Sequence, residues 1–104
     1  MINVLWVSPL RADVNKDIGI SFRSSPSERT IILIQRYTYV GGWGWFVLRH
    51  LLNEQLPEGI YTEIWDTSDD DGSTTYNQWN ADQVRVELYY GNTLIEETPI
   101  QIFF

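Results

Sequence analysis

Carboxylates crowd one short segment of this chain, directly after a tryptophan. From Asp66 to Gly72 the sequence is Asp-Thr-Ser-Asp-Asp-Asp-Gly. A hard cation such as Ca²⁺ takes about six to eight oxygen ligands, from carboxylates and carbonyls on a flexible loop. The segment could therefore hold an irregular calcium site, whose candidate ligands are Asp66, Asp69 and Asp71.

This segment does not follow the calcium loop of an EF-hand. With Gly72 at the invariant glycine, the first position holds Thr67 rather than Asp and the last holds Gln78 rather than Glu. Asp, Ser and Gly are also the residues that turns favour, because their short side chains bond nearby backbone groups. A solvated turn is therefore the simpler interpretation, and no other cofactor is indicated.

Catalytic chemistry has few residues to draw on here. The chain has no cysteine and a single histidine, His50, whereas catalysis needs several groups that converge in a pocket. Asp66 and Asp70 could act as an acid and a base, but a chain this short hardly builds the cleft that a glycosidase pair faces. We expect a protein that is not an enzyme, with a hydrolase as the weakest alternative.

Aromatic residues form the second conspicuous group, with five tryptophans and six tyrosines in 104 residues. Several flank Gly41 and Gly42, which can adopt the positive φ angles that a hairpin turn requires. Exposed aromatic clusters mark protein interfaces or platforms on which sugar rings stack. Trp6 and Trp65 are expected in the core. The aromatics expected to stay exposed near predicted loops, as candidate binding residues, are Tyr37, Tyr39, Trp43, Trp45 and Trp79.

The end of the chain offers another candidate contact surface. Leu94–Phe104 is long for a last strand, and its final residues are β-forming and uncharged. Soluble monomers protect such edges with charges, proline or bulges. Those devices occur only upstream of the apolar end, at Glu96, Glu97 and Pro99. We therefore predict that Ile100–Phe104, with Phe103 and Phe104 as candidate binding residues, contacts a neighbouring subunit or partner chain by strand addition or apolar burial. The alternative is an ordinary last strand paired with Val84–Tyr90.

Short strands must position these residues, because apolar side chains recur with a period of two through much of the chain. After Arg49 a loop is expected, and a short helix over Trp45–Leu52 is the alternative for that segment. Residues 73–82 are expected to form a long loop or a short edge strand. The predicted strands are Asn3–Val7, Ile18–Phe22, Thr30–Ile34, Trp45–Arg49, Ile60–Trp65, Val84–Tyr90 and Leu94–Phe104.

About seven strands with turns between them predict an all-β sandwich in one domain, residues 1–104, with an OB-like barrel or a jelly roll as alternatives. A net charge of −7 opposes phosphate groups and argues against general binding of nucleic acid or anionic membranes. No apolar run approaches the roughly 18 residues of a membrane helix, and a signal peptide is not apparent.

Leu56–Gly72 resembles the immunoglobulin-like domain of flagellar hook-capping proteins and related modules of secreted bacterial proteins. The match extends weakly to the predicted strands on either side. Thr67 replaces a glycine of the family pattern, Glu63 replaces an apolar residue, and the Gly-x-Tyr that opens a later strand is missing. The residues that carry the resemblance are Leu56, Gly59, Tyr61, Trp65, Asp66, Asp69, Asp70 and Gly72.

The resemblance implies an immunoglobulin-like β-sandwich that serves as a structural or protein-binding module, extracellular or part of an assembled particle. Its partner would then be a protein, including further copies of itself in a homo-oligomer. The alternative, which rests on the residues alone, is a small carbohydrate-binding sandwich that uses Trp43 and Trp45.

Overall fold

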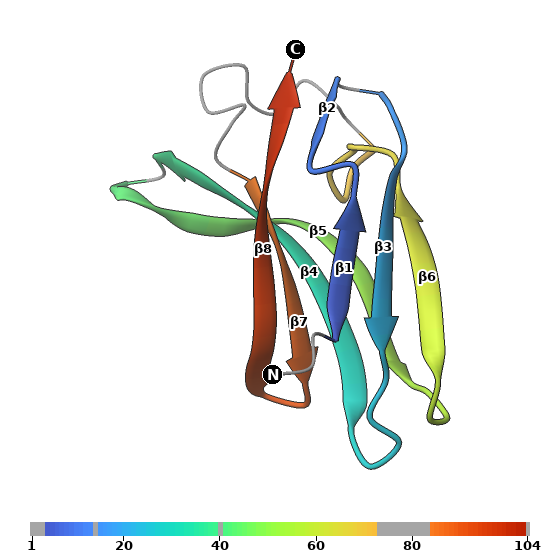
Figure 1. Cartoon of the computed structure of the whole chain (residues 1–104). Helices are drawn as coiled ribbons and strands as arrows, with labels where there is room; N and C mark the ends of the chain where they lie inside the picture. Colours follow the sequence, from blue (N-terminus) through green and yellow to red (C-terminus); the bar gives the residue numbers. More distant parts are fainter. Residues whose placement is uncertain (1–3, 14, 40, 73–83, 104) are drawn as a thin grey trace.

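The computed structural model describes residues 4–13, 15–39, 41–72 and 84–103, which form two β-sheets (Figure 1). One sheet has the order β1-β3-β6 and the other the order β2-β8-β7-β4-β5. Neighbouring strands are antiparallel except β2 and β8, which are parallel. The all-β, two-sheet architecture expected from the sequence is confirmed. The strands are β1 (Leu5–Ser8), β2 (Arg11–Asp13), β3 (Ile18–Arg23), β4 (Arg29–Tyr39), β5 (Trp43–Gln55), β6 (Ile60–Trp65), β7 (Val84–Tyr90) and β8 (Thr93–Phe103).

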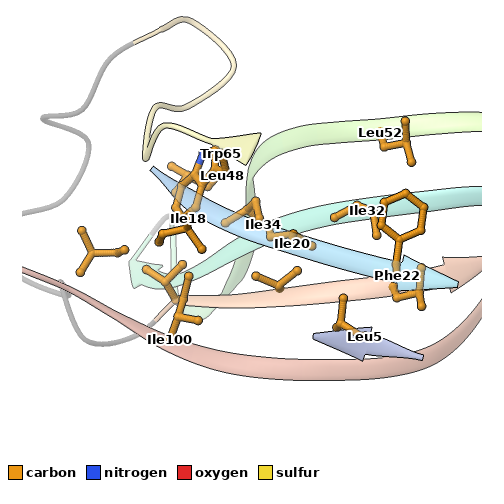
Figure 2. Packing of buried hydrophobic residues seen from close by; sticks show 14 of the residues in the cluster. Leu5, Ile18, Ile20, Phe22, Ile32, Ile34, Leu48, Leu52, Trp65 and Ile100 are labelled. Carbon is orange, nitrogen blue, oxygen red and sulfur yellow. The ribbon is translucent and has the colours of Figure 1, made fainter. Parts of the chain in front are cut away.

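Alternating apolar residues build the core between the sheets. Ile18, Ile20 and Phe22 of β3 are fully buried, as the period-two pattern predicts. Figure 2 shows them facing Ile32 and Ile34 of β4 across the interior. Burying one such side chain contributes about 1.5–3 kcal/mol relative to leaving it exposed, so the two faces together hold the sheets against each other.

Two tryptophans expected in the core have different positions. Trp65, the last residue of β6, is fully buried and lies beside Leu48 and Ile18 at one end of the core (Figure 2). Its indole N–H donates to the Ser68 carbonyl at 2.7 Å. The prediction for Trp6 was wrong, since its side chain is 41% exposed. Leu5 takes the inward position on β1, and the alternation turns the next residue outward.

The fifth strand is longer than predicted. A loop was expected after Arg49, yet β5 continues to Gln55, which pairs with Arg29 of β4. Two register shifts interrupt this pairing, and such bulges let successive residues on one strand oppose a single residue on the other. Leu48 and Leu52 lie in the core, and the two shifts explain why burial along the strand does not alternate strictly.

The additional strand, β2, had no sequence signal. Its three residues are Arg-Ala-Asp, and only Ala12 is buried. It forms a strand because it pairs with Gln101–Phe103 of β8, whose residues lie 90 positions further along the sequence. None of the described residues forms a helix with the length and apolar character that a membrane crossing requires.

The β4–β5 hairpin extends beyond the neighbouring strand of its sheet. Pairing between β4 and β7 ends at Arg36, whereas pairing between β4 and β5 continues to Tyr39 and Trp43. In Figure 1 the end of this hairpin extends away from the two sheets. We call its end, Tyr37–Tyr39 together with Trp43–Trp45, the aromatic arm.

Candidate binding surface

The aromatic arm gathers four rings on one face. Tyr37 lies opposite Trp45 and Tyr39 opposite Trp43 in the ladder, and directly opposed residues point to the same side of a sheet. Tyr37 stacks on Trp43 with 5.7 Å between ring centroids. The contacts Tyr37–Trp45 and Tyr39–Trp43 are both edge-to-face at 5.6 Å. Each ring therefore holds a neighbour in place.

The outermost rings of the arm remain largely in solvent. Tyr39 is 62% exposed and Trp43 61% exposed, whereas Trp45 is partly covered. The covering group is Arg85 of β7, whose guanidinium carbon lies 4.0 Å from the centroid of the Trp45 ring. A cation over an indole face is attracted by the ring quadrupole, so this contact ties the base of the arm to the sheet.

Arg85 also belongs to a polar cluster on the outer face of the five-stranded sheet. Its Nη2 lies 3.3 Å from Glu87 Oε2, and its Nε lies 3.7 Å from Glu97 Oε2. The two glutamates oppose each other in the β7–β8 ladder, an arrangement that is unfavourable without a cation between them. Trp45, Arg85, Glu97 and Pro99 line a hollow of about 220 Å³ beside the arm.

Glu87 departs from the expected pattern. Alternation along β7 predicted an exposed side chain, and it does point to the outer face, yet it is only 2% exposed. Arg85 covers it from one side, and Tyr89 donates a hydrogen bond to its Oε1 at 3.1 Å. Burial and the nearby Glu87 charge raise the pKa of Tyr89, which keeps the phenol protonated as a donor.

Many polar groups of the acidic loop, Asp66–Gly72, form hydrogen bonds with one another or with β5. Asp66 Oδ1 accepts a hydrogen bond from the Ser68 amide at 3.1 Å and a shorter one from the Ser68 hydroxyl. Asp69 Oδ1 accepts from the Asp71 amide at 2.9 Å. These bonds within a few residues are typical of Asx turns.

Further bonds fasten the acidic loop to the edge of β5. The Asp70 amide donates to the Leu48 carbonyl at 3.1 Å, and Asp70 Oδ1 accepts from the His50 amide at 2.8 Å. Arg49 Nη1 donates to both Ser68 Oγ and the Asp69 carbonyl at 3.0 Å. The loop thus occupies backbone groups of β5 that would otherwise be open to another strand.

Both anchoring carboxylates are held in their charged form. The hydrogen bonds from Ser68 lower the pKa of Asp66 below its usual range. For Asp70, partial burial raises the pKa, but the hydrogen bonds and charge of His50 and the charge of Arg49 outweigh it and leave the pKa lowered. A carboxylate that accepts several hydrogen bonds titrates at lower pH.

Calcium binding at Asp66, Asp69 and Asp71 stays a prediction. Within the described ranges, no three His, Asp or Glu side chains are gathered in a way that could hold a metal ion. Two of the three carboxylates already accept hydrogen bonds from the loop itself. An ion at this position would compete with the bonds that shape the turn.

His50 and Asp70 form the nearest approach to a catalytic pair, with His50 Nδ1 2.6 Å from Asp70 Oδ2. Both side chains are well exposed at the strand edge. A nucleophile activated by this histidine would bond to its other ring nitrogen, and no hydroxyl among the described residues does so. The pair instead fixes the acidic loop to β5.

The candidate residues named from the sequence fall in separate places. Tyr39, Trp43 and Trp45 come together in the aromatic arm. Phe103 is half-exposed at the end of β8, toward the opposite edge of the same sheet, where Arg11 lies 5.3 Å from the centroid of its ring. Trp79 and Phe104 lie outside the described residues. Arg85 and Glu87 were missed, because only the strand register brings them under the arm.

The last strand is paired within its own sheet. Val84–Tyr90 forms one neighbour of β8, so the expected pairing of the last strand is confirmed. A contact of this segment with a neighbouring subunit stays a prediction. On the other side, β2 pairs with Gln101–Phe103, so strand addition at that edge would have to displace β2. No protein-family model, curated protein or solved structure matches this chain.

Proposed function

We propose that this chain is an immunoglobulin-like, non-enzymatic module whose aromatic arm binds a protein partner. The strand order supports the fold assignment. In immunoglobulin-type sandwiches one sheet contains strands A, B and E, and the other contains G, F, C and, in variable-type domains, C′. The sheets β1-β3-β6 and β8-β7-β4-β5 follow these two orders, with β2 added beside β8.

The observation that carries the binding proposal is the exposed, mutually packed set of rings on the arm. Tyrosine, tryptophan and arginine dominate the energetically important residues of protein interfaces. Tyr39 and Trp43 are exposed while each is braced by another ring, so ordering them on binding costs little conformational entropy.

Ring orientation favours a protein over a carbohydrate. A chain of sugar units stacks on rings that lie side by side in one plane, whereas Tyr39 and Trp43 are inclined by 66° and Tyr37 and Trp45 by 62°. The near-parallel pair, Tyr37 and Trp43 at 13°, is stacked rather than side by side. One face of Trp45 is covered by Arg85. The surface is therefore stepped and amphipathic, which suits the irregular relief of a protein.

A photo-crosslinking experiment tests this proposal. Benzoylphenylalanine is placed at Trp43, and at Trp6 on the other sheet as the matched control, and each protein is irradiated in an extract of the source cells. We expect a discrete protein adduct from position 43 alone. Excess unmodified chain should compete for it, and the Trp43→Ala chain should compete about tenfold less well.

The sugar alternative is tested on the same variants. Tryptophan fluorescence is titrated with soluble polysaccharides, using the unmodified chain and Trp43→Ala. Saturable quenching that Trp43→Ala abolishes, without a position-specific protein adduct, would overturn the proposal in favour of carbohydrate binding. Equal adducts from positions 43 and 6 would also overturn it.

A further inference from the structure

The strand β6 forms one edge of the three-stranded sheet, and β3 is its neighbour on the inner side. Among the described residues, no strand pairs with its other side. In Figure 1 β6 is the outermost strand of its sheet. Unpaired amide and carbonyl groups on such an edge are a template for another strand.

Most of the devices that block strand addition are absent from β6. Its pairing with β3 runs without a register shift from Ile60 to Trp65, so no bulge bends it away. It contains no lysine or proline, and the one device present is Glu63, its single charge, on the inward face opposite Ile20. On the outward face Ile60 is 59% exposed and Ile64 55% exposed, which adds apolar surface beside the open edge.

We infer that β6 pairs with β6 of a second copy of this chain, antiparallel and about a two-fold axis through Thr62. This surface is on the other sheet from the aromatic arm, so the inference does not depend on the function proposed above. In this register Ile60 lies opposite Ile64 of the second copy on the outward face. Thr62 lies opposite its own copy, and Tyr61 lies opposite Glu63 on the inward face.

Sequence complementarity selects this occupant and this register. Directly opposed residues of an antiparallel pair must point to the same face, so a two-fold axis has to pass through a residue rather than between residues. Centring it on Glu63 would set two carboxylates directly opposite each other, which is destabilising. Centring it on Thr62 matches isoleucine with isoleucine twice and moves the carboxylates to diagonal positions, about 7–8 Å apart.

The neighbouring strands leave room for this pairing. Thr62 would lie on the axis. Within its own sheet it is paired with Ser21 of β3, which is paired in turn with Trp6 of β1. The Ser21 and Thr62 hydroxyls are 2.8 Å apart. Small side chains would therefore surround the axis, with a tryptophan at each end of this row of paired residues and the isoleucine pairs above and below it. The joined sheet would contain six strands.

Charge sets the conditions under which the pair forms. Each chain carries a net charge of −7, so two copies repel each other and the repulsion is screened by salt. We expect the dimer fraction to rise with ionic strength, opposite to the behaviour of an interface held by ion pairs.

Cysteine cross-linking reports the register directly, because the chain contains no cysteine of its own. Thr62→Cys should form a disulfide dimer under mild oxidation, since directly opposed Cβ atoms lie within about 4.5–5.5 Å. Ile60→Cys and Ile64→Cys should each cross-link poorly alone and form a mixed dimer when combined. Leu94→Cys, at an exposed position on β8, is the control for random collision, and we expect it to react about tenfold more slowly.

A second variant keeps the test independent of disulfide chemistry. Thr62→Lys would oppose two ammonium groups at the axis, and Thr93→Lys adds the same charge at an exposed position elsewhere. Light scattering should show a concentration-dependent dimer for the unmodified chain and for Thr93→Lys, and a monomer for Thr62→Lys. A monomer at every concentration and salt level would overturn the inference, as would equal cross-linking rates for Thr62→Cys and Leu94→Cys.

Discussion

The two edge strands β5 and β6 are protected to very different degrees, although the acidic loop that follows β6 in the chain bonds to β5. β5 is interrupted by two register shifts, the loop bonds to Leu48 and His50, and Arg29 donates to the side chain and carbonyl of Asn53. The described part of β6 has none of these features and relies on Glu63 alone. The difference teaches that a protein of this size can close one edge with a local loop while leaving the other available.

The loop that closes β5 begins where β6 ends. Trp65 is the last residue of β6, and its indole donates to Ser68 within the loop. The position of the loop on β5 therefore depends on how β6 is anchored in the core. Changes at Trp65, Thr67 and Asp70, and a fall in pH, should therefore alter how well the two edges are protected, with the largest effect at Trp65.

Trp65→Ala should remove the anchor of both edges at once. Replacing a fully buried tryptophan by alanine typically lowers the free energy of unfolding by about 3–5 kcal/mol. Chemical denaturation should show this loss, and it should exceed that of any other single tryptophan truncation. Trp43→Ala, on the exposed arm, should change the stability by less than about 1 kcal/mol. Equal losses for the two variants would contradict the division between core and surface aromatics.

Thr67 is a strained residue at the turn between the two edges. It is buried with a φ of 67°, a conformation that costs a side-chain-bearing residue about 1–2 kcal/mol. The hydroxyl compensates, because it accepts the Asn15 amide at 2.7 Å and donates to the Asp66 carbonyl. These bonds explain how threonine is held in a backbone conformation that favours glycine.

Thr67→Ala should therefore destabilise the chain more than Thr67→Gly, although glycine removes more atoms. Both variants lose the hydroxyl bonds, worth about 1 kcal/mol each, but only glycine relieves the strain. We expect the glycine variant to be the more stable by about 1 kcal/mol in denaturant titrations. The reverse order would show that the buried methyl group matters more than the backbone conformation.

Local patterns in the sequence predicted the two sheets and most of the core. β3 and the end of β8 alternate clearly, because each has one face in the interior and one outside. The same logic failed for β5, whose bulges break the period, and for β2, whose only reason to be a strand is its partner on β8. Pairing between distant segments is not encoded in local periodicity.

The candidate sites divide in the same way. The glycine pair predicted a hairpin tip with exposed aromatics, and Tyr39, Trp43 and Trp45 do meet there. Arg85 could not be linked to that tip, since its place under Trp45 depends on the register of three strands. The acidic segment was recognised as a turn, but its contact with β5 follows from tertiary packing alone.

Asp70→Ala should open the edge of β5 without unfolding the sandwich. The variant removes the acceptor of the His50 amide and the contact with the histidine ring. Because this site is well exposed, we expect a loss of only about 1 kcal/mol in stability. Amide exchange at His50 should become faster. Asp71→Ala is the matched control, since the Asp71 carboxylate makes no hydrogen bond with the described residues; similar exchange in both variants would contradict the assigned role of Asp70.

Lowering the pH should reduce the protection of the β5 edge, so that it becomes more similar to the edge of β6. The hydrogen bonds from Ser68, and from His50 together with nearby positive charge, lower the pKa values of Asp66 and Asp70 in the folded chain. A group whose pKa is lower in the folded state stabilises that state above its unfolded pKa, about 3.9 for Asp. The stabilisation is lost as the pH falls from there through the lowered folded value. Amide exchange at His50, corrected for its intrinsic pH dependence, should lose protection in this range while β6 changes little.

The double variant Asp66→Asn, Asp70→Asn isolates this effect from general acid denaturation. It should be less stable than the unmodified chain near neutral pH, and the two melting temperatures should converge as the pH falls below about 4. If the two curves stayed parallel to the lowest pH at which the chain folds, the carboxylates would not be the groups that couple the acidic loop to β5. Convergence would instead assign the protection of that edge to two titratable side chains, which β6 lacks on its outward face.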